Sequence, residues 1–157
     1  MPELPEVEIL AHHLRPLLRG KTIRGVEVRR AKSLRPTSPQ ALQNVLRGAK
    51  FTDLSRRGKY LLFALRAKTS GKPVTLLGHL GMTGRMFVAP KNGPLPKHAA
   101  VVLDLGRQRF IYEDTRYFGR LTLDLSAVAK LGQSPGEVSP EVAALVARAA
   151  VLRPAVA

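Results

Sequence analysis

The sequence is divided into short apolar segments separated by turns, and this spacing constrains the fold more than any other feature. Eight segments of four to seven residues are rich in Val, Leu, Phe or Tyr, and Gly, Pro or basic residues separate them: 22–28, 51–56, 60–65, 74–80, 85–88, 99–105, 109–113 and 120–125. Short strands joined by tight turns usually pair with their antiparallel neighbours. The sequence therefore predicts a mainly β fold, a two-sheet antiparallel β-sandwich of about eight strands with flanking helices.

Three segments have helical patterns instead. Residues 5–18 begin with Pro5, which suits a first turn, and place Val7, Leu10 and Leu14 on one face. Pro16 is expected to kink or shorten this helix. A second short helix is expected within 38–48 and a third at 141–152, and residues 126–140 are predicted to form a loop-rich linker.

The charge is large and unevenly distributed. The formal net charge is +15, from 26 basic and 11 acidic residues, but only three of each lie after residue 120. The first 120 residues therefore carry the whole excess, which favours a polyanionic partner, and nucleic acid above all. A ribosome-associated protein or a merely basic surface are the alternatives.

Several classes of protein are disfavoured. The sequence has no Cys, so it offers neither disulfides nor thiolate ligands for zinc. No apolar run is long enough for a membrane span, and the acidic N-terminus does not resemble a signal peptide. We expect a cytoplasmic protein.

The N-terminus has the groups for covalent chemistry. Removal of Met1, which is common before Pro, would leave Pro2 with a free secondary amine, and an α-amino group has a far lower pKa than Lys. Such an amine can attack a sugar C1′ and form an iminium directly. Glu3 could exchange a proton with the sugar. For the acidic residues alone, stabilisation of a helix N-terminus explains Glu6 and Glu8 well and Glu3 poorly.

The run MPELPEVE at residues 1–8 resembles the N-terminal signature of formamidopyrimidine-DNA glycosylases, bifunctional glycosylases and lyases that act on 8-oxoguanine and formamidopyrimidines. The resemblance implies base-excision repair through a Schiff base on Pro2, with Glu3 as acid and base. It also implies a bacterial enzyme located with the nucleoid.

Three further blocks match the family in order. RRGKYLL at 56–62 resembles a hairpin whose Lys, here Lys59, binds a phosphate and assists β-elimination. HLGMTG at 79–84 resembles a block in which His79 contacts a phosphate and Met82 fills the gap left by the extruded base. Taken alone, the first block is a solvated basic turn and the second an ordinary loop.

The third block, DTRYFG at 114–119, resembles the family's DPRRFG. The resemblance implies that Arg116 reads the orphaned opposite base and that Phe118 inserts between base pairs. Two positions depart from the pattern, with Thr115 for Pro and Tyr117 for Arg. His98 matches a DNA-contacting His, although this is the weakest match.

The resemblance covers about residues 1–140. It predicts a catalytic domain at 1–130, with 131–157 as a linker and the start of a truncated C-terminal region. In the family, a helix–two-turn–helix and a four-Cys zinc finger follow, and neither is expected here. The chain is therefore expected to hold no cofactor. Its expected partner is damaged double-stranded DNA, on which it would act weakly or not at all by itself. A separate chain could supply the other half.

Two alternatives remain open from the sequence. One is a basic sandwich that binds DNA damage or abasic sites without turnover. The other is a degenerate fragment of the enzyme that retains its motifs.

Overall fold

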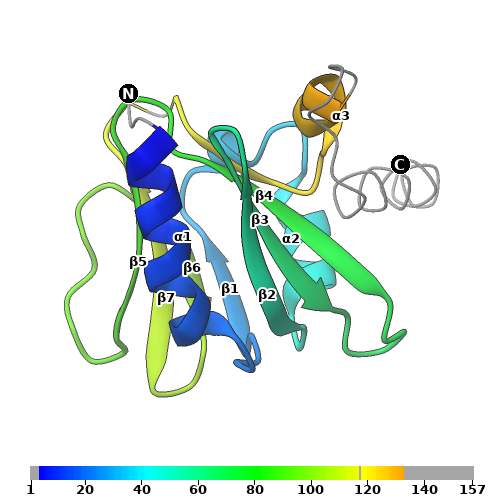
Figure 1. The fold of residues 1–157 in the computed structure, drawn as a ribbon. Coiled ribbons are helices and arrows are strands. Elements are labelled where there is room, and N and C mark those ends of the chain that lie inside the picture. The colour runs from blue at the N-terminus through cyan, green and yellow to red at the C-terminus, as the bar shows by residue number, and fades with distance from the viewer. Residues whose placement is uncertain (1–3, 117, 133–157) are drawn as a thin grey trace.

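Two four-stranded antiparallel sheets form the sandwich in the computed structural model, which describes residues 4–116 and 118–132 (Figure 1). The first sheet has the order β1 (Gly25–Val28), β6 (Ala99–Asp104), β7 (Gln108–Asp114), β5 (Gly84–Pro90). The second has the order β2 (Lys50–Arg57), β3 (Tyr60–Arg66), β4 (Pro73–His79), β8 (Arg120–Thr122). The predicted sandwich of eight strands is confirmed.

The core lies between the two sheets and is built around three Phe rings. Phe63 of β3 contacts Phe110 of β7 edge to face at 5.5 Å between ring centroids, which joins the two sheets, and Phe51 of β2 lies 6.2 Å from Phe63. All three side chains are buried. Edge-to-face aromatic pairs add to the hydrophobic gain of burial, so these rings fix how the sheets face each other.

The helices close the open sides of the sandwich. Helix α1 (Leu4–Leu18) packs along β2 and also contacts β5, the edge strand of the other sheet. Its buried residues recur at helical spacing: Val7, Ala11, Leu14 and Leu18. The helix continues through Pro16, so the expected shortening is not observed. On the opposite side, α2 (Pro39–Leu46) contacts β1, and a 3₁₀ turn, η1 (Ala31–Leu34), contacts β8.

The predicted linker at 126–140 is wrong at its start, because α3 (Ser126–Gly132) is helical. Val128 is buried with Leu62, Leu77 and Leu125 on the outer face of the second sheet, and this packing stabilises a helix that local sequence does not reveal. Residues 133–157, with the expected helix at 141–152, lie outside the described residues. Within the described part, no helix is long and apolar enough to cross a bilayer.

Candidate functional site

Four segments that are distant in sequence lie at one end of the sandwich, the upper end in Figure 1. They are the start of α1, the β2–β3 turn, the β4–β5 connection and the connection between β7 and β8. Strand register brings them together, because Tyr60 and Arg120 both lie opposite His79, and Gly84 lies opposite Asp114. Most of the residues singled out in the sequence are on these segments.

Asp114, at the end of β7, is the hydrogen-bonding centre of the upper end. Its Oδ1 accepts from the Thr83 hydroxyl at 2.7 Å and from the Arg116 amide at 3.1 Å. Its Oδ2 accepts from the Tyr112 hydroxyl at 2.9 Å and from the Gly119 amide at 2.8 Å. Four donors on one fully buried carboxylate tie the β4–β5 connection to the β7–β8 connection.

The ionisation of this centre follows from its surroundings. Burial raises the pKa of Asp114, but the hydrogen bonds from Thr83, Gly119, Tyr112 and Arg116 outweigh it and hold the pKa below its usual value. Burial, and then the negative charge of Asp114, raise the pKa of Tyr112. The hydroxyl therefore stays protonated and donates to a carboxylate that is charged at neutral pH.

Two glycines allow the connections to approach each other closely. A Cβ on Gly119 would lie 2.3 Å from the Tyr112 hydroxyl oxygen and 2.4 Å from the His79 carbonyl oxygen. Gly81 has φ +61°, and a Cβ there would lie 2.6 Å from the Gly119 amide nitrogen. No side chain fits at either position, so the two loops pack backbone against backbone.

This packing displays two apolar side chains on neighbouring loops. Met82 is 50% exposed and Phe118 is 57% exposed, although both are large and apolar. Among the described residues, only Ile9 on α1 is a third exposed large hydrophobic residue. Exposed apolar side chains on neighbouring loops are typical of a surface that binds a partner.

His79, at the end of β4, lies beside this pair. Its Nδ1 accepts a hydrogen bond from the Gly81 amide at 3.2 Å, so the proton of the neutral ring is on Nε2. Its ring lies 5.0 Å from that of Tyr60. Burial lowers the pKa of His79, and the charges of Lys59 and Arg120 lower it further. The ring is thus a neutral donor among cations.

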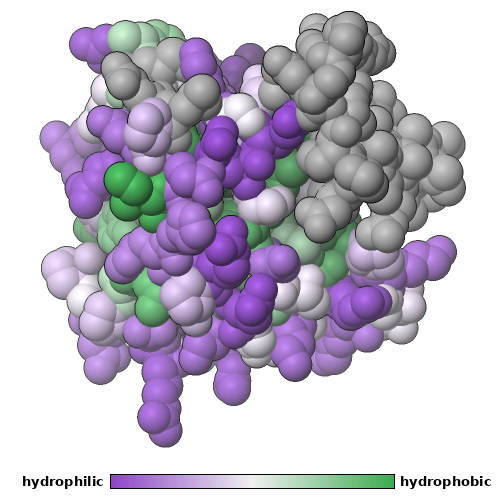
Figure 2. Space-filling view, viewed as in Figure 1, coloured by the Kyte–Doolittle hydropathy of each residue, from purple (hydrophilic) through white to green (hydrophobic). Residues whose placement is uncertain are grey.

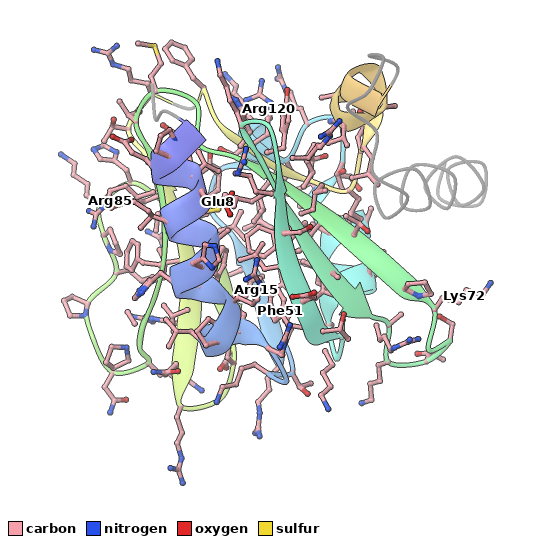
Figure 3. All side chains as sticks on the ribbon, in the orientation of Figure 1. Glu8, Arg15, Phe51, Lys72, Arg85 and Arg120 are labelled. Carbon is pink, nitrogen blue, oxygen red and sulfur yellow. The ribbon has the colours of Figure 1, made fainter. Side chains whose placement is uncertain are left out.

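Lys59 lies at the exposed β2–β3 turn, and Glu8 connects this hairpin to α1. Figure 3 shows the Glu8 side chain between α1 and β2. Its carboxylate pairs with the Arg56 guanidinium, and the same guanidinium donates to the Gly58 carbonyl at 2.8 Å. The hydrogen bond from Arg56 is the main reason that the pKa of Glu8 is lowered. The turn that carries Lys59 is therefore held against the first half of α1.

The structure places some of the predicted site residues at the upper end and does not describe others. Lys59, His79, Met82, Arg116 and Phe118 lie on the segments of the upper end, and Arg116 is exposed. The predictions for Pro2 and Glu3 fall outside the described residues.

His98 precedes β6 and meets the same cluster through its backbone. Its carbonyl accepts from the Asp114 amide at 3.1 Å, whereas its Nδ1 is buried without a hydrogen-bond partner in the described part of the chain.

Sequence reasoning missed Asp114 and Glu8 as organising residues. The signal for Asp114 was its place at the head of the DTRYFG block. Glu8 was assigned only to helix-end electrostatics. No group of three or more His, Asp or Glu is placed to hold a metal ion in the part of the chain that the structure describes.

The neutral state of His79 predicts a pH dependence. Its folded pKa is below the unfolded value of about 6.5, so the unfolded chain takes up a proton first as the pH falls. The resulting stability is complete above pH 6.5 and is lost as the pH falls toward the folded pKa. Urea unfolding at pH 7.5 and 5.5 should show a smaller loss for His79→Gln than for wild type. Equal losses would contradict the assignment.

Residues 1–121 match the family model of the formamidopyrimidine-DNA glycosylase N-terminal domain. The formamidopyrimidine-DNA glycosylase of Carboxydothermus hydrogenoformans is 38% identical over 143 residues, which cover 90% of this chain and 51% of that protein. The chain thus spans about half the length of the curated relatives it matches.

Two solved Lactococcus lactis structures share the fold, each with a TM-score of 0.73. One is the wild-type enzyme with DNA that contains an N7-benzyl-Fapy-dG, at 31% identity, covering 83% of this chain and 47% of that one. The other is the glycosylase bound non-covalently to DNA with an abasic site, at 30% identity, covering 83% and 48%.

Proposed function

Because the chain belongs to the formamidopyrimidine-DNA glycosylase family, we propose that it supplies the catalytic half of an enzyme that removes oxidised purines from DNA. The proposal places the catalytic domain at 1–130 and a connecting segment at 131–157. One observation carries it: the start of α1, the Lys59 turn and the loops with Met82 and Phe118 meet at one end of the sandwich. We expect one bound nucleotide to reach all of them.

The proposed chemistry begins at Pro2. Its amine attacks C1′ of the damaged nucleotide, the bond from C1′ to the base breaks, and the base leaves with the bonding electrons and a proton. Glu3 gives a proton to the ring oxygen, the bond from C1′ to that oxygen breaks, and the nitrogen lone pair forms the iminium. Glu3 later accepts a proton. Loss of a C2′ proton from the iminium then expels the 3′ phosphate. Lys59 supports this step by binding a neighbouring phosphate.

In this proposal, the loops at the upper end make the contacts with DNA. The Nε2 proton of His79 is available to a phosphate oxygen, since its Nδ1 is already occupied by Gly81. Phe118 enters the stack, Met82 fills the space left by the flipped nucleotide, and Arg116 contacts the opposite base. Asp114 holds the backbone from which Arg116 and Phe118 extend.

The apolar pair can be tested separately from the fold. Met82→Ala with Phe118→Ala should weaken binding to an abasic-site duplex by roughly 5- to 20-fold, because the unstacked gap loses its filler. Thermal stability should change little, since both side chains are half exposed. Ile9→Ala is the matched control, because Ile9 is 68% exposed on α1. An equal loss of binding in the control would contradict a specific role.

Glu8 should act on the rate by positioning the hairpin. We expect Glu8→Gln to slow formation of the covalent adduct by roughly 3- to 10-fold, because the Lys59 turn is no longer held against α1. Glu27→Gln is the control, since it weakens an exposed pair between Glu27 of β1 and Arg29, which follows that strand. Single-turnover kinetics on abasic DNA measure both variants. A wild-type rate in the Glu8→Gln variant would rule out a positioning role for Glu8.

Borohydride trapping with an abasic-site duplex tests the proposal, because this substrate requires no base excision. Intact mass first establishes whether Met1 has been removed. We expect a trapped adduct from chains that begin at Pro2 and none from chains that keep Met1. DNA binding without any adduct from processed chains would favour the non-catalytic binding module.

A further inference from the structure

A cationic cavity of about 360 Å³ lies at the lower end of the sandwich, opposite the proposed active site. The segment after α1, the residue after β5 and the β6–β7 hairpin form its walls. The lining residues are Lys21, Arg24, Lys91, Leu105, Gly106, Arg107 and Gln108. Helix α1 has 15 residues and runs from one end to the other, so about 20 Å separate the two regions.

Backbone hydrogen bonds make the cavity walls rigid. The Arg24 amide donates to the Asp104 carbonyl at 2.7 Å, and the Lys91 amide donates to the Arg107 carbonyl at 3.1 Å. The Leu105 amide closes the hairpin on Gln108 at 2.9 Å. All three walls are therefore tied to the first sheet by backbone hydrogen bonds.

Gly106 brings a guanidinium close to the hairpin backbone. It has φ +104°, and a Cβ there would lie 3.3 Å from Arg24 Nε. Its amide donates to Asp104 Oδ1 at 2.8 Å. Glycine thus serves both the turn and the close approach of Arg24.

The charges at the cavity do not balance. Asp104 is the nearby carboxylate, and its Oδ2 is already paired with Lys91 Nζ at 3.1 Å. In the described part of the chain, Lys21, Arg24 and Arg107 form no ion pair within 4 Å, although the charge of Arg24 also helps to lower the pKa of Asp104. Three cations that face one small space repel each other unless an anion joins them. Figure 2, in the same view as Figure 1, shows mainly hydrophilic side chains toward the lower end of the sandwich.

We propose that this cavity binds a compact polyphosphate, independently of the lesion duplex at the other end. Several converging cations match two or more phosphate groups better than one, and guanidinium groups bind phosphate oxygens through paired donors. The volume exceeds that of a single phosphate, and Leu105 and Gln108 give a neutral wall beside the cations. A free nucleotide and a phosphorylated strand end share this chemistry.

Pyrophosphate is the probe for the shared chemistry. Titration into the ¹⁵N-labelled chain should shift the amides of Gly106 and Arg107, and calorimetry gives the Kd. Arg24→Gln with Arg107→Gln should raise this Kd at least about tenfold, because two of the converging cations are lost. Lys72→Gln, which removes an exposed cation outside the cavity (Figure 3), should leave it within about twofold.

Further arms identify the source of the phosphate. Tighter binding of a nucleoside triphosphate than of pyrophosphate assigns a free nucleotide, and preference for a 5′-triphosphate over a 5′-hydroxyl oligonucleotide assigns a strand end. If the double variant does not fold, the two single variants provide the same comparison. Unmoved Gly106 and Arg107 amides, or unchanged affinity in the Arg variants, would overturn the proposal. Neither result bears on the chemistry at Pro2.

Discussion

Replacing Pro2 by Gly is expected to lower the rate of borohydride-trapped adduct formation on abasic DNA by on the order of 10²-fold. The secondary amine of Pro forms an iminium that carries a permanent positive charge. The primary amine of Gly forms an imine that must gain a proton before it can withdraw electrons. Single-turnover trapping with excess protein measures this rate directly.

The unfolding transition and the duplex affinity of the Pro2→Gly variant are the controls. Among the residues whose burial is described, Val7 is the first buried residue of α1, and we expect Pro2→Gly to leave the unfolding transition unchanged. Duplex affinity should also be retained, because the loops with Met82 and Phe118 are intact. A Pro2→Gly variant that traps at the wild-type rate would contradict the requirement for a secondary amine.

Replacing Asp114 by Asn is expected to destabilise the fold by about 2–4 kcal/mol and to abolish measurable duplex binding. Each carboxylate oxygen accepts one hydroxyl and one backbone amide. An Asn side chain turns one of these acceptors into a donor. The hydroxyls of Thr83 and Tyr112 can rotate away, but the amides of Arg116 and Gly119 cannot, so one of them loses its partner.

Urea unfolding and duplex titration measure the two effects. Asp53→Asn is the matched control, because its carboxylate is exposed and pairs with Arg15 and Arg19 on the surface. We expect its stability to change by less than about 1 kcal/mol. An Asp114 variant that is as stable as the control and still binds DNA would contradict the central role of this carboxylate.

The strands could be predicted because their sequence signals are local. Residues 60–65 and 74–80 are apolar, end in turns and form β3 and β4 almost as expected. The strand expected at 120–125 ends early, at Thr122, whose hydroxyl bonds that of Thr37 at 2.8 Å. Helix α3 was missed because it depends on Val128 packing against the outer face of the sheet. Contacts of this kind cannot be predicted from the spacing of apolar residues along the sequence.

Some residues of the candidate site were predicted from the sequence in the same way, and others were not. The resemblance predicted that Lys59, His79 and Phe118 belong to one site, and the structure places their segments at one end of the sandwich. Their roles stay predictions. Asp114 was missed although it heads the DTRYFG block, since its role depends on Thr83, which is 31 residues away. The lower cavity is less predictable still, because three separate segments contribute its cations. Composition indicates many basic residues, but only the fold shows which of them converge.

Mapping the adduct to one nitrogen tests the central claim most directly. The chain is trapped with borohydride on an abasic oligonucleotide and digested with a protease and a nuclease, and the modified peptide is sequenced by mass spectrometry. We expect the sugar remnant on the amine of Pro2, in a peptide that lacks Met1. A remnant on the side chain of Lys59, or on any other lysine, would contradict it.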